Sequence, residues 1–265
     1  MTVALINGQP ASADDLRALA LSNYGHFTVM QVRARAVQGL EFHLQRLQQA
    51  TLELFGCELS RQHVLDNLRA ALDTSGDGNA SLRLTVFARD FDYRKPMHPV
   101  VPDVLVTLAP PVPAGKPPIR VSAYPFVRPL PHIKHVGTFP LFHYRRQAQQ
   151  AGFDDALFVT PEGWVSEGSI WNIGFWDGSQ VIWPEAPALR GSCEALVQGG
   201  LETLGVPQQI RPVGQAELGG FQAAFAANAS GLQPVTGING VEYGVDEVLM
   251  ALLAEALASC PWDPL

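Results

Sequence analysis

The chain has 265 residues, of which 47% are hydrophobic and 16% charged, and its formal net charge is -7. This length and composition are typical of a globular protein with one large domain or two small ones. The charge is spread without long acidic or basic blocks, so we expect no nucleic acid as the main partner. A local pocket could still hold a small anion.

The cysteines and the apolar runs bear on the location of the protein. Cys57, Cys193 and Cys260 are far apart and contain no CxxC pair. We therefore expect neither a disulfide framework nor a zinc finger, but a reducing, cytoplasmic setting. The first residues lack the pattern of a signal peptide, and no apolar run approaches the ~18 residues of a membrane span, so we expect no membrane partner.

Strands and helices are both predicted in the first 110 residues. A short strand ends at an Asn-Gly turn (2–10), a second strand runs into a hairpin (26–40), and two more strands follow later (80–90 and 102–110). Apolar residues at helical spacing predict helices over 40–55 and 60–75, the second with Ser60 as its cap.

The proline-rich segment 111–118 predicts an extended connection between two lobes. The predicted organisation is therefore an N-terminal α/β lobe over 1–110, this linker, and a C-terminal lobe over 119–265. In the second lobe we predict strands at 119–126, 156–159, 172–176 and 181–184, and helices at 138–151, 192–204 and 245–259.

Lys134 is the last of only three lysines in a chain with fifteen arginines. It stands between His132 and His135, just before a predicted helix. On local grounds it is either a solvated surface residue or a lysine whose neutral amine attacks a carbonyl to form a Schiff base. The other two, Lys95 and Lys116, stand in proline-flanked stretches that are typical of loops.

Charged residues in two other segments could also be functional. Glu167 lies in an aromatic segment close to Trp164 and Trp171. A buried carboxylate needs a partner, so this residue is either a turn or capping glutamate or the partner of a protonated ring nitrogen. Arg89 and Arg94 follow a predicted strand and either hold a substrate carboxylate or face solvent.

Two turns with small residues could bind an anion through backbone amides. Ser192 and Cys193 would open a helix, whose first N–H groups have no partner within the helix. The second turn lies within 227–235. In the first lobe, His43 and Arg46 fall one helical turn apart on one face of the predicted helix.

Taken together, these segments resemble the class IV aminotransferases, the fold-type IV pyridoxal 5′-phosphate (PLP) enzymes. That family includes branched-chain and D-amino acid aminotransferases and 4-amino-4-deoxychorismate lyases. The resemblance covers most of the chain, and its most specific part is a long spacing: Lys134, a helix, GFDDAL at 152–157 and EGWVSEGSIWN at 162–172. It implies a two-lobed α/β (α+β) fold with a small N-terminal lobe and a larger, PLP-binding C-terminal lobe, assembled as a homodimer.

The resemblance also implies roles for particular positions. Lys134 matches the lysine that forms the Schiff base with PLP and moves the substrate proton, and Glu167 matches the carboxylate that faces the pyridine nitrogen. Arg46 matches an arginine that binds the cofactor phosphate. The other implied cofactor-binding residues are Asn172, Gly191, Ser192, Cys193, Asn228 and Ala229. The implied substrate-binding residues are Arg94, Thr28 and Tyr24.

Four positions depart from the family pattern or indicate a branch. Cys193 and Asn228 stand where the family often has threonine; the change to cysteine weakens a hydroxyl contact and leaves the backbone amides. Phe139 stands where branched-chain enzymes have a tyrosine, and therefore points away from branched-chain substrates. Thr28 resembles a threonine of the lyase branch, although it could equally be an ordinary strand residue.

Four functions follow from these patterns. The first is a PLP-dependent aminotransferase that acts on a small amino acid or amine. A 4-amino-4-deoxychorismate lyase, which yields 4-aminobenzoate and pyruvate, would use the same residues. A PLP-binding protein without turnover would account for the altered turn at 191–193. A metal hydrolase built on His132, His135 and His143 lacks the HExxH spacing, and we expect no metal.

Overall fold

A computed structural model describes residues 3–113 and 115–265. Ala114 of the predicted linker and the first two residues of the predicted first lobe lie outside the described residues. The chain forms two compact units. Unit 1 runs to Val112 and also includes Ile133–Gly137 and Trp262–Leu265, whereas unit 2 comprises Pro113–His132 and Thr138–Pro261. The lobe limits 1–110 and 119–265 stay a prediction, and Lys134 falls in unit 1.

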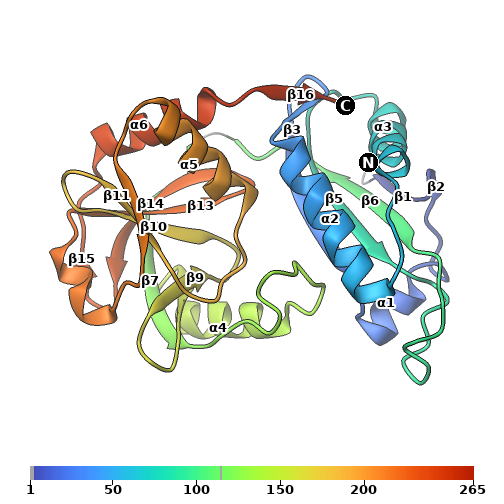
Figure 1. Cartoon of the computed structure of the whole chain (residues 1–265), viewed down its shortest axis with the longest axis horizontal. Coiled ribbons are helices and arrows are strands. Elements are labelled where there is room, and N and C mark those ends of the chain that lie inside the picture. The colour runs from blue at the N-terminus through green and yellow to red at the C-terminus, as the bar shows by residue number, and fades with distance from the viewer. Residues whose placement is uncertain (1–2, 114) are drawn as a thin grey trace. The chain divides into compact units, whose positions relative to one another are not determined.

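Unit 1 is built on a five-stranded antiparallel sheet in the order β2-β1-β6-β5-β3 (Figure 1). The strands are β1 (Val3–Ile6), β2 (Gln9–Pro10), β3 (His26–Val32), β5 (Ala80–Phe87) and β6 (Asp103–Ala109). Asn7 and Gly8 join β1 to β2 with positive φ angles of 48° and 78°, which confirms the predicted Asn-Gly turn. A second tight turn at Ala34 and Arg35 links β3 to β4 (Ala36–Gln38), which pairs with β16 (Trp262–Pro264).

Two helices pack their apolar sides on this sheet. They are α2 (Leu40–Phe55) and α3 (Arg61–Ser75), close to the predicted limits. Leu44, Leu47 and Leu68 are buried with the alternate, inward-facing residues of the strands. The Ser60 hydroxyl accepts a hydrogen bond from the His63 backbone N–H and so caps α3 as predicted. The short helix α1 (Arg17–Ser22) has no buried residue and no apolar period from which it could be predicted.

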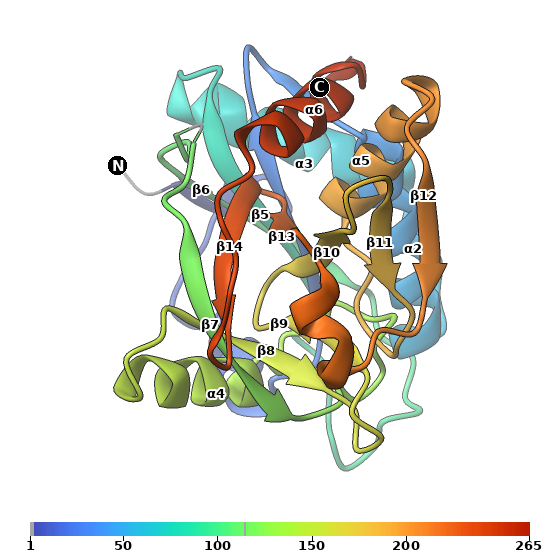
Figure 2. The ribbon, with the colours of Figure 1, turned by 90° about the vertical axis from the view of Figure 1, so that its left-hand side faces the viewer.

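Unit 2 contains a nine-stranded mixed sheet, whose main path runs β12-β11-β10-β13-β14-β7-β8-β9 and can be followed in Figure 2. The strands are β7 (Ile119–Pro125), β8 (Asp155–Val159), β9 (Val165–Gly168), β10 (Asn172–Trp176), β11 (Val181–Pro184), β12 (Gln208–Arg211), β13 (Ala223–Asn228), β14 (Gly231–Ile238) and β15 (Val241–Glu242). The sequence predicted β7, β8, β10 and β11. It did not predict β13 and β14, because their alanines and glycines give a weak strand signal.

The helices of unit 2 are α4 (Phe139–Gln150), α5 (Ser192–Thr203) and α6 (Glu247–Ala258), with a 3-10 helix over Gln215–Gly220. All three α-helices were predicted, with limits that differ by one or two residues. Helices α5 and α6 pack side by side (Figure 1). A Cβ atom at Gly200 would lie 2.0 Å from the Ala256 carbonyl oxygen, so this glycine sets the close approach. Among the described residues, no helix is long and apolar enough to cross a bilayer.

We predict that Gly200→Ala destabilises the protein by roughly 1–3 kcal/mol, since the added methyl group must push α5 away from α6. The neighbouring Gly199 is a matched control, because a Cβ atom there meets no atom within 4 Å. Gly199→Ala should raise the free energy of unfolding by up to about 1 kcal/mol through helix propensity. Urea unfolding of both variants tests the pair, and equal effects would contradict the packing argument.

Candidate functional site

The segment around Lys134 is fixed by backbone hydrogen bonds along the start of β3. The Phe27 N–H donates to the Lys134 carbonyl over 2.9 Å, and the Val136 N–H donates to the Gly25 carbonyl over 3.0 Å. A Cβ atom at Gly25 would lie 2.6 Å from the Val86 carbonyl oxygen, so this approach requires glycine. The Lys134 Nζ atom lies 5.0 Å from the centre of the Phe27 ring. The strand thus sets the position of the lysine amine.

A hydrogen-bond chain joins Arg46 and His43 of α2 to Thr28 of β3. Arg46 Nη2 donates to Thr28 Oγ1 over 2.5 Å, and Thr28 Oγ1 lies 2.6 Å from His43 Nδ1. The guanidinium can only donate, so Thr28 Oγ1 accepts from Arg46, and the direction of its bond to His43 Nδ1 depends on the tautomer of the histidine. The helical spacing that places His43 and Arg46 on one face brings both to the same hydroxyl.

Burial keeps the side chains of His43 and His26 uncharged at neutral pH. Burial first, and then the positive charges of Arg46 and Lys134, lower the pKa of His43 from 6.5 to about 3. Burial lowers the pKa of His26 to about 3 as well. The Thr51 hydroxyl donates to the Leu47 carbonyl, so the His26 Nε2–H donates to Thr51 Oγ1 over 2.9 Å. Lys134 and Arg46 both lie near His43 and are therefore brought together within unit 1.

Arg46 has one buried donor that the protein does not use. Its Nε atom is buried and, among the described residues, has no hydrogen-bond acceptor. Burial lowers the pKa of the guanidinium to about 10, which still leaves Arg46 charged at neutral pH. A buried donor of a charged group is unfavourable without an acceptor. The arrangement fits an anion that would accept from Arg46.

A second arginine approaches the ring that Lys134 faces. The Arg83 Cζ atom lies 3.7 Å from the centre of the Phe27 ring, and Arg83 Nε donates to Thr85 Oγ1 over 3.2 Å. Burial lowers the Arg83 pKa. No carboxylate pairs with Arg83 in the part of the chain that the structure describes. The sequence did not single out this residue, which stands inside an ordinary strand pattern.

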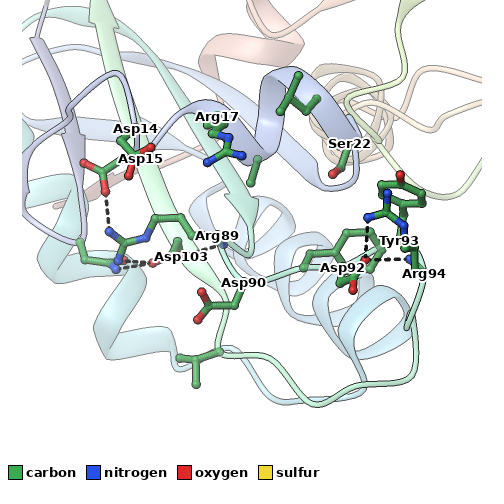
Figure 3. A pocket seen from close by; sticks show the side chains of 15 residues that line it. Asp14, Asp15, Arg17, Ser22, Arg89, Asp90, Asp92, Tyr93, Arg94 and Asp103 are labelled. Atoms are coloured by element: carbon green, nitrogen blue, oxygen red, sulfur yellow. Dashed lines mark hydrogen bonds and ion pairs between the residues drawn. The ribbon is translucent and has the colours of Figure 1, made fainter.

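The predicted substrate-binding residues Tyr24 and Arg94 have other contacts. The Tyr24 hydroxyl donates to the Leu54 carbonyl over 2.9 Å, and its ring stacks on Phe91 at 4.3 Å. Arg94 is exposed and lies 4.0 Å from Asp92, at the rim of a pocket of about 950 Å³ (Figure 3). That pocket is also lined by Asp14, Asp15, Asp90 and Asp103. These carboxylates disfavour the binding of an anionic ligand in this pocket. Substrate binding by Arg94 stays a prediction.

Glu167 of β9 forms a buried ion pair with Arg128. Arg128 Nε donates to Oε1 over 2.8 Å and Nη2 donates to Oε2 over 3.3 Å, and both residues are at most 4% exposed. A two-pronged pair of this kind holds the carboxylate in one orientation. Glu167 is thus neither a capping nor a turn residue. Arg128 was not predicted, because no local pattern links it to a glutamate 39 residues away.

The turn before α5 is held by Asn172. Its Nδ2 donates to the Leu189 carbonyl over 2.7 Å, and its Oδ1 accepts from the Gly191 N–H over 3.1 Å. A Cβ atom at Gly191 would lie 2.4 Å from that Oδ1, so the turn needs a glycine. Ser192 and Cys193 then open α5, and both are buried. Anion binding by the amide donors at this helix end stays a prediction.

Four side chains, Arg190, Glu194, Cys193 and Lys116, act on the electrostatics at the start of α5. Arg190 Nη1 donates to Glu194 Oε1 over 2.9 Å, but burial still raises the pKa of this carboxylate, and its Oε2 atom has no hydrogen-bond partner among the described residues. Burial raises the pKa of the Cys193 thiol to about 12, although the Lys116 charge and the Asn228 backbone amide both oppose the shift. Cys193 therefore stays a neutral thiol at neutral pH.

The second predicted turn, with Asn228 and Ala229, joins β13 to β14. Asn228 Oδ1 accepts from the Ser230 N–H over 2.9 Å and from Lys116 Nζ over 2.8 Å. Lys116 also donates to the Gly231 carbonyl over 3.4 Å. This lysine was assigned only to a loop, yet it lies within hydrogen-bond distance of a predicted cofactor turn.

The predicted residues thus form two groups. In unit 1 the structure brings together Lys134, Arg46 and Thr28. Tyr24 and Arg94 make their contacts with other residues. In unit 2, Asn172 holds the predicted turn at Gly191. Phe139 begins α4 with a side chain that is 76% exposed. Among the described residues, no group of three His, Cys, Asp or Glu side chains could hold a metal ion.

We predict that the stability of the protein falls on mild acidification because His43 is buried. Below pH 6.5 the unfolded chain takes up a proton at His43 that the folded chain excludes until about pH 3. The free energy of unfolding should therefore fall in this range, by up to about 1.4 kcal/mol per pH unit from this residue. His43→Gln, which keeps an acceptor for Thr28, should remove that part of the slope.

Urea unfolding between pH 7 and pH 4 measures this slope. His98→Gln is the control, because His98 is exposed. A His43→Gln variant with the same pH dependence as the unaltered protein would show that His43 does not exclude the proton.

We predict that Arg128→Met destabilises the protein by about 3–5 kcal/mol, because it leaves the Glu167 charge buried without a partner. Adding Glu167→Gln should restore part of the loss, since the amide carries no charge. Arg61→Met, which breaks an exposed pair with Glu41, should cost less than about 1 kcal/mol. Thermal or urea unfolding of the unaltered protein and the three variants measures these losses of stability. A loss of stability in Arg128→Met no larger than in Arg61→Met would contradict the prediction.

The comparisons with known proteins agree with this architecture. The branched-chain aminotransferase from the thermophilic archaeon Thermoproteus uzoniensis, solved with norvaline, matches with a TM-score of 0.84 at 17% identity, covering 97% of this chain and 94% of that one. A protein assigned provisionally as a 4-amino-4-deoxychorismate lyase from Legionella pneumophila gives 0.81 at 19% identity over 94% and 95%. A hypothetical aminotransferase from Mycobacterium tuberculosis, in its PLP-bound form, gives 0.80 at 20% identity over 98% and 99%.

These likenesses show the two-lobed fold of the fold-type IV enzymes. A search of curated proteins found no match. The sequence model of the amino-transferase class IV family matches residues 25–238, most of the chain. The chain therefore belongs to the class IV aminotransferase family of PLP-dependent enzymes.

Proposed function

We propose that the protein is an aminotransferase that moves an amino group between a small amino acid or amine and a keto acid, with Lys134 holding PLP as a Schiff base. The observation that carries this proposal is the group of cations near His43. Lys134 and Arg46 both lower the pKa of that histidine, and Arg46 keeps a buried donor without an acceptor among the described residues. An amine next to a cation that requires an anion suits a phosphorylated aldehyde.

PLP, when bound, supplies the electron sink that stabilises negative charge at the substrate Cα atom. Arg46 would bind the phosphate. The amides at Ser192 and Cys193 and at Asn228 and Ala229 are the further donors that the family resemblance implies. Lys134 Nζ would accept the proton from the substrate Cα atom and return it.

Glu167 would hold a proton on the ring nitrogen of the cofactor. This role needs an ionised carboxylate at a fixed position, and the two hydrogen bonds from Arg128 provide both conditions. Arg128 would thus act through Glu167 as a positioning residue. The sequence alone did not indicate this residue.

Recognition of a substrate carboxylate has two candidates. Arg94, the residue that the family resemblance implies, is exposed beside Asp92. Arg83 is partly buried, has no carboxylate partner among the described residues, and shares the Phe27 ring with Lys134. Burial strengthens the attraction of a cation for a carboxylate. We therefore propose Arg83 as well as Arg94 for this role.

The lyase and the PLP-binding protein without turnover remain alternatives. Thr28, the residue that favoured the lyase, uses its hydroxyl to accept from Arg46 and to hydrogen-bond with His43. The threonine thus acts on Arg46 and gives the lyase no separate support. A homodimer and a cytoplasmic location are also proposals.

The purified protein should show the visible absorbance of a PLP Schiff base. Reduction with borohydride, followed by peptide mass analysis, should place the phosphopyridoxyl group on Lys134. Lys134→Ala should lose the absorbance band and at least 10²-fold of any turnover, because both the covalent link and the proton carrier are gone. Absence of the band in the unaltered protein, or an unchanged spectrum in the variant, would exclude the proposal.

A panel of amino donors then separates the three functions. Conversion of the bound cofactor to pyridoxamine 5′-phosphate supports transamination. Pyruvate release from aminodeoxychorismate without that conversion supports the lyase. Binding of PLP with neither outcome supports the protein without turnover.

A further inference from the structure

Lys116 is a cation at the two turns of unit 2 that are proposed to bind phosphate. Its Nζ atom donates to Asn228 Oδ1 over 2.8 Å and to the Gly231 carbonyl over 3.4 Å. Its positive charge also acts on the Cys193 thiol at the start of α5. The lysine is therefore bound at the β13–β14 turn and is close enough to the amino end of α5 to act on it electrostatically.

The charge of Lys116 is not compensated by the residues around it. Both of its hydrogen-bond acceptors are neutral amide oxygens, and no carboxylate pairs with it among the described residues. The closest candidate for a negative charge is Cys193, but burial keeps that thiol protonated. Glu194, one residue further, is bound by Arg190. Burial lowers the pKa of Lys116, as expected for a cation that loses water without gaining an anion.

The side chains of the two turns supply few donors of their own. Cys193 offers a thiol, which is a weak donor. The Asn228 side chain directs its oxygen at Lys116 and at the Ser230 N–H. The remaining donors at these turns are the backbone amides, the Asn228 Nδ2 amide and the hydroxyls of Ser192 and Ser230, and none of them carries a full charge. A phosphate monoester with nearly two negative charges would gain most from a nearby ammonium group.

We propose that Lys116 is a ligand of the cofactor phosphate, supplying in unit 2 the positive charge that the two turns lack. This inference rests on the proposed function, because it assigns a further residue to the same cofactor. Lys116 would bind the phosphate as a point charge while Asn228 holds its Nζ atom in place. The ligand class is a phosphate monoester on a pyridine ring.

Pyridoxamine 5′-phosphate and pyridoxamine are the probes, since neither can form a Schiff base with Lys134 and they differ only in the phosphate. Calorimetric titration of the full-length apoprotein gives both dissociation constants. Lys116→Met should weaken binding of the phosphorylated probe about 10- to 100-fold and leave binding of pyridoxamine unchanged within about 2-fold. Lys116→Arg should restore most of the affinity. The control Lys95→Met, which removes an exposed lysine, should change neither constant.

The outcomes separate this inference from the proposed function. If Arg46→Met loses the preference for the phosphorylated probe and Lys116→Met keeps it, the role of Lys116 is wrong and the proposed function stands. If the unaltered protein shows no preference for the phosphorylated probe, both are wrong. Circular dichroism and the thermal midpoint without ligand show whether Lys116→Met is folded. An equal loss of affinity for both probes would mean general damage and would overturn the specific role.

Discussion

Removing a positive charge from water without a carboxylate partner is unfavourable, and each of the two units holds at least one cation in that condition. Arg46, Arg83 and Lys116 are partly buried, and burial lowers the pKa of each. Their hydrogen-bond acceptors are neutral hydroxyl, carbonyl and amide oxygens. Such oxygens orient a cation without neutralising it, so the full electrostatic attraction remains available to an anionic ligand. The buried carboxylate Glu167 shows the opposite arrangement, because Arg128 compensates it completely.

The neutral side chain of His43 also leaves the charge of Arg46 available to an anionic ligand. A protonated His43 would repel Arg46, so the arrangement of both residues around Thr28 is favoured while His43 is uncharged. Burial excludes that proton down to about pH 3. A single threonine hydroxyl thereby holds an arginine and a neutral histidine at one place.

Sequence patterns identified the elements whose signals are local and missed those whose signals are distant. The apolar period of 40–55, the Ser60 cap and the Asn-Gly turn each depend on neighbouring residues, and the structure has all three. Strand β13 is rich in alanine and gains its place from pairing with β10 and β14, which no local window shows. In the site, the spacing of His43 and Arg46 was visible in the sequence. The partnership of Arg128 with Glu167 was not, because 39 residues separate them.

The proline-rich segment 111–118 illustrates how a local signal can be incomplete. Its prolines predict an extended stretch, since each ring fixes φ and removes a donor. Extended chain with few donors cannot join the sheet of unit 2 by its own amides, so it must be held from outside. Gln233 Nε2 donates to the Pro117 carbonyl over 2.7 Å and supplies that attachment from β14. Pro117 and Pro118 restrict the backbone directly after Lys116, which lowers the entropy lost when its amine is held at Asn228. A segment that composition describes as a linker thus also carries a cation that Asn228 binds.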